Sequence, residues 1–304
     1  MFEKKYLDQV KILLNILPLI GKHKEFAIKG GTAINFFIFN VPRLSVDIDL
    51  CYLPIESRES TFKKINILIK EIAESVKKRF PEYTINLMKS GSANIYKLII
   101  SGNRVSVKIE PNELLRGNVK KSEIRRIRKE VAAIFNLFPE AHILSTSDIF
   151  GGKICAAFDR QHPRDLFDIY MMFENNIFNE EVKKVFLIYL IQSGRPISEM
   201  LNPNKLDISK PYNNEFKGMV NKDITIDQLY SAREKLVKTI TSNINPNEKE
   251  FLLSVKKGEP DWDKLEIGNF LHLPGVQWKL QNIKKISKEK KLKAYKKLEK
   301  ILSL

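Results

Sequence analysis

A short segment, residues 45–50, constrains the fold of this 304-residue chain more than any other. Its sequence, SVDIDL, alternates Val, Ile and Leu with polar side chains, which is the pattern of a half-buried β-strand. On such a strand Asp47 and Asp49 project from one face about 7 Å apart, while the apolar residues bury the other face. Aspartate is a poor strand former, and two like charges repel each other, so the pattern indicates a function that overrides strand propensity. It predicts a cation bound between the two carboxylates.

The predicted cation is Mg²⁺, with Mn²⁺ as an alternative. Mg²⁺ takes one or two protein carboxylates and completes its shell with substrate phosphates, which makes Asp47 and Asp49 the expected metal ligands. Glu110 ends a second alternating segment, residues 104–110, and is a candidate third ligand. The alternative is an exposed edge strand with solvated aspartates and a surface Glu110. An isolated Asp-x-Asp pattern does not choose between these interpretations.

A Gly-Gly pair lies about 15 residues upstream of the acidic strand. Residues 26–33, FAIKGGTA, indicate a strand, a tight turn and the start of a helix, with Thr32 predicted to cap that helix. Gly30 and Gly31 let backbone N–H groups approach a phosphate, and a helix N-terminus attracts negative charge. Alone, such a pair is usually just a turn. Followed by Ser45 and the two aspartates, it predicts a phosphate cradle beside a metal pair.

A second motif spans residues 148–168 and two predicted helices. Lys153 and Arg160 lie on one stripe of the first helix, and Arg164, Asp165 and Asp168 share the first turn of the next. Cations near a triphosphate neutralise the charge that develops in phosphoryl transfer. The alternative is an internal ion-pair network that joins the two helices, and the spacing alone is compatible with both.

The mixture of elements changes near Ser145. Upstream of it strands and helices alternate, whereas the rest of the chain is almost wholly helical. We therefore predict an α/β (α+β) fold, with a mixed-sheet domain over residues 1–145 and a helical domain over residues 146–304. Helices are predicted over residues 6–19, 32–39, 56–79, 146–158, 164–173, 180–193 and 226–240, and strands over residues 25–28, 46–53, 83–88, 95–101 and 105–109, the last two joined by a hairpin turn at residues 101–103.

The Gly-Gly turn, the helix and the Ser-x-Asp-x-Asp strand together resemble the signature of the DNA polymerase beta-like nucleotidyltransferase superfamily. With the downstream pattern Lys-x₂-Ala-x₃-Arg-x₃-Arg-Asp-x₂-Asp, the chain resembles the AbiEii family, nucleotidyltransferase-like toxins of bacterial toxin–antitoxin and abortive-infection systems. The resemblance extends from about residue 20 to near the C-terminus. It implies a nucleotidyltransferase lobe followed by a helical lobe, and transfer of a nucleotide from an NTP to an acceptor hydroxyl, with pyrophosphate released.

The resemblance also implies roles for individual residues. Four residues match the catalytic constellation of the family: Ser45, Asp47, Lys153 and Asp168. Asp49 matches the family's second metal ligand, so the expected catalytic residues are Asp47, Asp49, Lys153 and Asp168. Expected to bind the nucleotide or its phosphates are Gly30, Gly31, Ser45, Arg160, Arg164 and Asp165. The expected metal ligands are Asp47, Asp49 and Glu110. The implied acceptor is RNA, most simply a tRNA 3′ end, and the implied partner is a cognate antitoxin.

The charge balance favours a polyanionic partner. The chain has 52 Lys and Arg against 36 Asp and Glu, a net charge of +16. Residues 116–130 hold seven basic and two acidic side chains and are predicted to contact an RNA backbone. Residues 281–304 hold nine lysines on a helix that we predict to pack one face and to solvate the other. Two other interpretations stay open: a small-molecule acceptor such as an antibiotic, and an inactive nucleotide- or RNA-binding module.

The low cysteine content indicates a protein of a reducing compartment. Two cysteines, Cys51 and Cys155, cannot build a disulfide framework and are expected to be small buried hydrophobes. No signal peptide is evident, and the longest apolar runs are far below the ~18 residues of a membrane span. We expect a soluble cytoplasmic protein.

Overall fold

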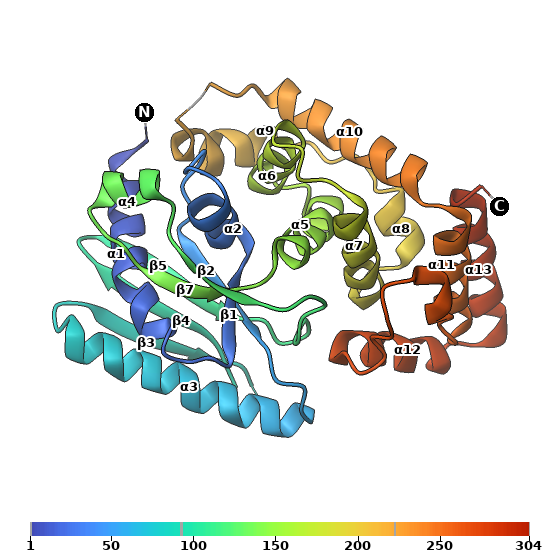
Figure 1. The fold of residues 1–304 in the computed structure, drawn as a ribbon, viewed down its shortest axis with the longest axis horizontal. Helices are drawn as coiled ribbons and strands as arrows, with labels where there is room; N and C mark the ends of the chain where they lie inside the picture. The colour runs from blue at the N-terminus through green and yellow to red at the C-terminus, as the bar shows by residue number, and fades with distance from the viewer. Residues whose placement is uncertain (1, 92–93, 222, 304) are drawn as a thin grey trace. The chain divides into compact units, whose positions relative to one another are not determined.

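The computed structural model describes residues 2–91, 94–221 and 223–303, and the chain forms two compact units (Figure 1). The first, called here the sheet unit, comprises Met1–Ile149 and Glu215–Asp223. The second, the helical unit, comprises Phe150–Asn214 and Ile224–Leu304. The segment Glu215–Asp223 joins the sheet unit through backbone contacts. Arg43 forms a bridge with Val220, and Leu44 N donates to Met219 O at 2.7 Å.

The sheet unit is built on a seven-stranded mixed sheet with strand order β3-β4-β5-β2-β1-β7-β6. The strands are β1 (Phe26–Lys29), β2 (Asp47–Tyr52), β3 (Thr84–Lys89), β4 (Ile95–Gly102), β5 (Val105–Pro111), β6 (Glu123–Arg126) and β7 (Glu140–Ile143). The β2–β5 and β1–β7 pairs are parallel, and the other pairs are antiparallel. This mixed sheet beside many helices confirms the predicted fold class.

Strand alternation decides which face of the sheet forms the core. Ile48 and Leu50 of β2 are fully buried, as are Ile109 of β5 and Leu98 of β4, whereas the residues between them are partly exposed. The helices of this unit are α1 (Lys4–Ile20), α2 (Gly30–Ala33), the π-helical turn η1 (Ile34–Ile38), α3 (Arg58–Arg79), α4 (Lys129–Phe135) and the 3-10 turn η3 (Lys217–Met219). Helix α1 contacts β5, and α3 contacts β3 and β4. The polar face of β2 therefore stays available for chemistry.

The structure contains the predicted hairpin between β4 and β5, but its turn is shifted from the predicted residues 101–103, because Ser101 and Gly102 still pair with β5. Its two loop residues, Asn103 and Arg104, have φ angles of +51° and +63°. Positive φ at both central positions is the geometry of the type I′ turn, whose twist matches that of the flanking strands. This tight turn sets the register that aligns β5 with β2.

The helical unit is assembled around a buried helix. Its elements are α5 (Thr146–Arg160, which begins in the sheet unit), α6 (Pro163–Glu174), α7 (Glu180–Gln192), α8 (Ile197–Leu201), α9 (Ser209–Pro211), the π-helical turn η2 (Tyr212–Phe216, which ends in the sheet unit), α10 (Ile226–Asn243), α11 (Pro246–Lys257), the 3-10 turn η4 (Trp262–Leu265), α12 (Pro274–Lys285) and α13 (Lys288–Ile301). Residues 185–191 of α7 are buried all around the helix, which marks it as the centre of the unit. Gly151 of α5 permits a close approach to α7, because an added Cβ would lie 3.0 Å from Phe186 N. Among the described residues, none of the helices has the length and apolarity needed to cross a membrane.

Candidate active site

The Gly30-Gly31 turn joins β1 to α2 and is shaped by two requirements on Gly30. This residue has a φ angle of +69°, which side-chain-bearing residues rarely adopt. In addition, a Cβ atom at Gly30 would collide with the carboxylate of Asp49. The predicted proximity of the glycine turn and the acidic strand is therefore a feature of the fold.

Gly31 lies against two polar side chains, Arg43 and Ser45. A Cβ atom at Gly31 would be 2.7 Å from Arg43 Nη2 and 2.9 Å from Ser45 Oγ. Arg43 is 2% exposed, and its Nη1 donates to the carbonyl of Leu44 at 2.9 Å. A buried guanidinium beside a glycine turn is suited to phosphate, for which arginine offers several fixed donors. Arg43 is not among the residues predicted from the sequence, where its only signal is its place two residues before Ser45.

Thr32 connects the turn to the acidic strand. Its hydroxyl donates to the carbonyl of Asp47 at 2.6 Å and lies 3.1 Å from Ser45 Oγ. The prediction that Thr32 caps the helix is wrong: α2 begins at Gly30, its N-cap is Lys29, and no side chain caps it. The reason is that the hydroxyl of Thr32, which is fully buried, satisfies its hydrogen bonds across to β2.

Asp47 and Asp49 share the open face of β2. Both are partly exposed, whereas Ile48 and Leu50 beside them are fully buried. The parallel register of β2 and β5 places Asp47 opposite Lys108 and Asp49 opposite Glu110. The face thus carries acidic and basic side chains on neighbouring strands.

Glu110 is held by a lysine from the next strand. Lys97 Nζ lies 2.7 Å from Glu110 Oε1, and this hydrogen bond raises the pKa of Lys97 above its ordinary value. The negative charge of Asp47 contributes to the same shift of the Lys97 pKa, which indicates that Lys97 also feels the acidic strand. The assignment of Glu110 as a third metal ligand stays a prediction, because in this structure its carboxylate pairs with Lys97.

The β2 carboxylates fit a magnesium ion by their donor set. Two partly exposed carboxylates on one strand face are hard oxygen ligands, and Mg²⁺ takes one or two of these together with substrate phosphates. Among the described residues, no group of three or more His, Cys, Asp or Glu side chains is arranged to hold a metal ion. The fit is therefore to a substrate-completed ion bound through Asp47 and Asp49, rather than to a site enclosed by protein ligands.

The second motif forms a buried ion-pair network within the helical unit. Lys153 Nζ lies 2.9 Å from Asp165 Oδ1 and 2.9 Å from Asp168 Oδ2. These side chains are 7%, 3% and 0% exposed, respectively. Arg160, whose side chain is 63% exposed, donates to both carboxylate oxygens of Asp165. The geometry thus contains the internal network that the sequence allowed, and it also fixes the Lys153 ammonium in place.

Arg164 occupies the first turn of α6, as predicted. The N-cap of that helix is His162, whose Nδ1 accepts a hydrogen bond from Arg164 N at 3.2 Å. Pro163 follows at the first helical position, where a backbone N–H has no acceptor within the helix, so the lack of this N–H in proline costs no hydrogen bond. The loop histidine therefore has a structural role that the sequence did not reveal.

The basic segment of residues 116–130 is heterogeneous. Arg116 is buried, and burial lowers its pKa. Arg125 and Arg126 lie on β6, the edge strand of the sheet, where Arg125 pairs with Glu123. Arg128 Nε donates to Asn40 Oδ1 at 2.8 Å. Basic side chains on an edge strand also prevent strand-to-strand association, so the RNA contact predicted for this segment stays a prediction.

Neither cysteine is suited to nucleophilic chemistry. Cys51 is buried on β2, and burial raises the pKa of its thiol to about 12. Burial also raises the pKa of Cys155. Because the thiolate is the reactive form, both side chains are inert at neutral pH.

The structure thus collects the predicted residues into one cluster in each unit. In the sheet unit lie Gly30, Gly31, Ser45, Asp47 and Asp49, with Arg43 added and Glu110 on the neighbouring strand. In the helical unit lie Lys153, Arg160, Asp165 and Asp168, with Arg164 on the same helix as the two aspartates.

The mixed sheet, its glycine turn and its acidic strand define the class of a nucleotidyltransferase, and comparison with known proteins agrees. A family model described as nucleotidyl transferase AbiEii toxin, type IV toxin–antitoxin system, matches residues 11–282. The chain belongs to this AbiEii family and is a nucleotidyltransferase toxin.

A solved structure of another nucleotidyltransferase toxin shows the same fold. MenT4, a nucleotidyltransferase toxin from Mycobacterium tuberculosis H37Rv, superposes with a TM-score of 0.63 at 13% identity, covering 92% of this chain and 95% of that one. Terminal uridylyl transferase 4 from Trypanosoma brucei with bound GTP covers 79% of this chain and 94% of its own at 11% identity, but its TM-score of 0.28 is too low to carry an argument. Comparison with curated proteins gives no match.

Proposed function

We propose that the protein is a Mg²⁺-dependent enzyme that transfers a nucleotide from an NTP to a hydroxyl of RNA in the cytoplasm, most simply at a tRNA 3′ end. The observation that carries this proposal is the placement of the Asp49 carboxylate against Gly30, with Asp47 beside it on β2. Metal ligands and a backbone that admits phosphate are the two parts that nucleotidyl transfer requires. When bound, the ion would polarise the triphosphate and favour the ionised acceptor hydroxyl.

In this proposal the sheet unit binds and orients the triphosphate. Gly30 and Gly31 carry no side chain that would block the approach of a phosphate, and Arg43 and Ser45 flank Gly31. Thr32 links Ser45 to the Asp47 carbonyl and so maintains the spacing between the cradle and the carboxylates. Asp47 and Asp49 would hold the ion.

The family resemblance assigns Lys153, which lies in the helical unit, a role in the reaction. Asp168 and Asp165 pair with the Lys153 ammonium and restrict its position. A fixed ammonium offsets triphosphate charge without reorganisation during the reaction. In this assignment Asp168 acts through Lys153 as a positioning residue.

RNA as the acceptor is supported by the charge of the chain. A net charge of +16 favours a polyanion over a small neutral acceptor. As a member of a type IV toxin–antitoxin family, the protein would be paired with a cognate antitoxin.

The test is a transfer assay with total RNA and each α-labelled NTP in Mg²⁺. The wild-type protein should label an RNA band with one or more nucleotides, and Asp47→Asn and Asp49→Asn should each lower the rate by about a thousandfold or more. Glu113→Gln, which removes an exposed carboxylate of the sheet unit, is the matched control and should retain full activity. Labelling of a small molecule instead of RNA would show that the acceptor is not RNA. Wild-type rates in both aspartate variants would refute the assignment of Asp47 and Asp49 as the metal site.

A further inference from the structure

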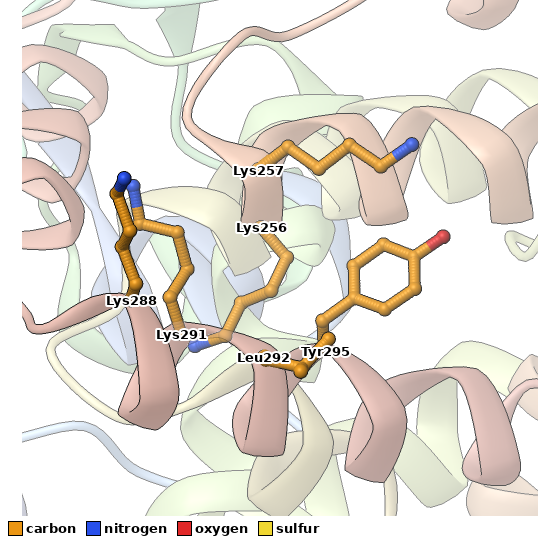
Figure 2. Close-up of a pocket in the computed structure, with 6 residues that line it drawn as sticks. All are labelled: Lys256, Lys257, Lys288, Lys291, Leu292 and Tyr295. Atoms are coloured by element: carbon orange, nitrogen blue, oxygen red, sulfur yellow. The ribbon is translucent and has the colours of Figure 1, made fainter.

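A pocket of about 500 Å³ lies within the helical unit, lined by residues of α11 and α13 (Figure 2). Its lining residues are Lys256, Lys257, Lys288, Lys291, Leu292 and Tyr295. This volume falls in the range of small-molecule sites. All six residues lie outside the motifs that the proposed function uses.

The positive charge of this lysine pocket is only partly compensated within the chain, because Glu199 raises the pKa of Lys256 but the effect of burial is larger. Among the described residues, Lys256, Lys288 and Lys291 form no ion pair with a carboxylate. Lys256 is only 9% exposed, and burial lowers its pKa. Lys279 is 8% exposed, and its pKa falls to about 8 because of burial and the charge of Lys256. An anion in the pocket would offset the unfavourable burial of the Lys256 ammonium.

The position of Lys288 and Lys291 on α13 gives an independent argument. Both lie in the first turn of a 14-residue helix, where the helix dipole is positive and disfavours cations. Glu289 lies in the same turn, but the lysines there outnumber it, and beside a buried Lys256 they leave an excess of positive charge that a bound anion would offset. Function is a common reason for a sequence to violate such a local rule.

The apolar residues of the pocket indicate more than a simple anion. Leu292 is 56% exposed, although it lies among lysines, and Tyr295 presents an aromatic ring on the same stripe of α13. Lys257 Nζ lies 5.3 Å from the centroid of that ring. Lysines combined with an aromatic platform match the two halves of a nucleotide, since phosphate pairs with ammonium and a base stacks on a ring.

We propose that the lysine pocket binds a nucleotide unit, with its phosphate at Lys256, Lys288 and Lys291 and its base against Leu292 and Tyr295. The unit can belong to a free nucleotide or to a single-stranded RNA. This binding needs neither Asp47 nor Asp49 nor a divalent cation, so it stands apart from the proposed transfer reaction.

The experiment measures binding in EDTA with two probes, AMP by calorimetry and a fluorescein-labelled A12 RNA by anisotropy. Lys288→Gln/Lys291→Gln removes two pocket lysines that are not buried. The matched control, Lys293→Gln/Lys296→Gln, removes two exposed lysines from the same helix at the same spacing. The pocket variant should weaken binding of at least one probe by about tenfold, and the control should change it by less than about threefold. With RNA, the slope of log K against log salt should fall by about 0.7 for each phosphate that the variant no longer neutralises.

The pattern over the two probes identifies the source of the nucleotide. If the pocket variant loses binding of both AMP and RNA, the pocket binds nucleotides in general. If it loses AMP alone, the pocket binds free nucleotide, and if it loses RNA alone, the pocket binds a strand. Equal weakening by the pocket and control variants overturns the proposal and leaves a solvated basic helix.

A second pair of variants tests the stacking half of the proposal. Tyr295→Phe should retain affinity, whereas Tyr295→Leu should lose about fivefold or more. If Tyr295→Leu binds both probes normally, and polyglutamate of matched charge competes as well as RNA does, the pocket is a general polyanion patch and the nucleotide assignment fails. Because no transfer is measured, failure of this proposal is separate from failure of the proposed function.

Discussion

The candidate-site aspartates of the sheet unit and those of the helical unit lie in opposite environments. In the helical unit, Asp165 and Asp168 are buried and neutralised by Lys153 at 2.9 Å. In the sheet unit, Asp47 and Asp49 remain partly exposed on one strand face. A buried, paired carboxylate is part of the framework, whereas paired aspartates on an open face are suited to a cation that comes and goes. The comparison separates aspartates that position another side chain from aspartates that are suited to bind a metal ion.

The largest expected effect is on the helical unit. Lys153→Met leaves two buried carboxylates with Arg160 as their remaining cation, and should lower the free energy of unfolding by about 3–5 kcal/mol. Urea denaturation measures the loss. The control is Arg160→Gln, which removes an arginine with a 63% exposed side chain from the same network and should cost less than about 1 kcal/mol. Equal losses of unfolding free energy in the two variants would show that the ion pairs of Lys153 are no more buried than those of Arg160.

A glycine substitution in each unit should give opposite signs. Gly30→Ala should destabilise the protein by about 1–2 kcal/mol or more, because of its positive φ and the collision with Asp49. Gly152→Ala, in the interior of α5, should stabilise it by about 0.5–1 kcal/mol, since the new Cβ would lie 3.6 Å from Tyr189. Thermal unfolding of both variants decides the question. If Gly30→Ala raised the unfolding temperature, Gly30 would not combine a positive φ angle with a close contact to Asp49.

The ion pair on the open face of the sheet should matter less than the buried one. Lys97→Met should lower stability by about 1 kcal/mol or less, and the difference should vanish in 1 M NaCl. Glu110 raises the pKa of Lys97, so the contribution is complete below about pH 10.5, the unfolded value, and is lost as pH rises through the folded value. Denaturation of wild type and variant at pH 8 and above pH 11 measures this. A difference that grows with pH would have the wrong sign.

The smallest effect distinguishes the aspartates of the sheet unit from those of the helical unit. In EDTA, Asp49→Asn should raise the unfolding free energy by about 0.6 kcal/mol, the repulsion of two charges ~7 Å apart in water. Asp168→Asn should instead lower it, since Lys153 loses a partner. Differential scanning fluorimetry of the pair, with and without Mg²⁺, gives both signs. Loss of stability in both variants would remove the distinction between the two units.

Much of the sheet unit could be predicted because its signals are local. The two-residue period of residues 45–50 marks β2, and the Gly-Gly pair marks the turn before α2. The β4–β5 hairpin needs only its own turn residues. In each case the information lies within about ten residues of the structure that it specifies.

What the sequence did not show depends on residues that are distant in the chain. Arg43 becomes part of the cradle because the chain folds it against Gly31, and Val220, which follows α3 to α9 in the chain, pairs with it. Lys256 and Lys288 line one pocket only because α11 packs on α13, so the helix predicted to pack one face and to solvate the other also lines a pocket. Hydrophobic periodicity contains no such long-range information.

The most direct measurement of the central claim is calorimetric titration of NTP with and without Mg²⁺, in the wild-type protein and in Asp49→Asn. If Asp47 and Asp49 hold the ion that accompanies the triphosphate, wild-type affinity should rise tenfold or more on addition of Mg²⁺, since the carboxylates otherwise repel the phosphates. Asp49→Asn should lose most of that gain. Equal NTP affinity in EDTA and in Mg²⁺ for the wild-type protein would contradict the account.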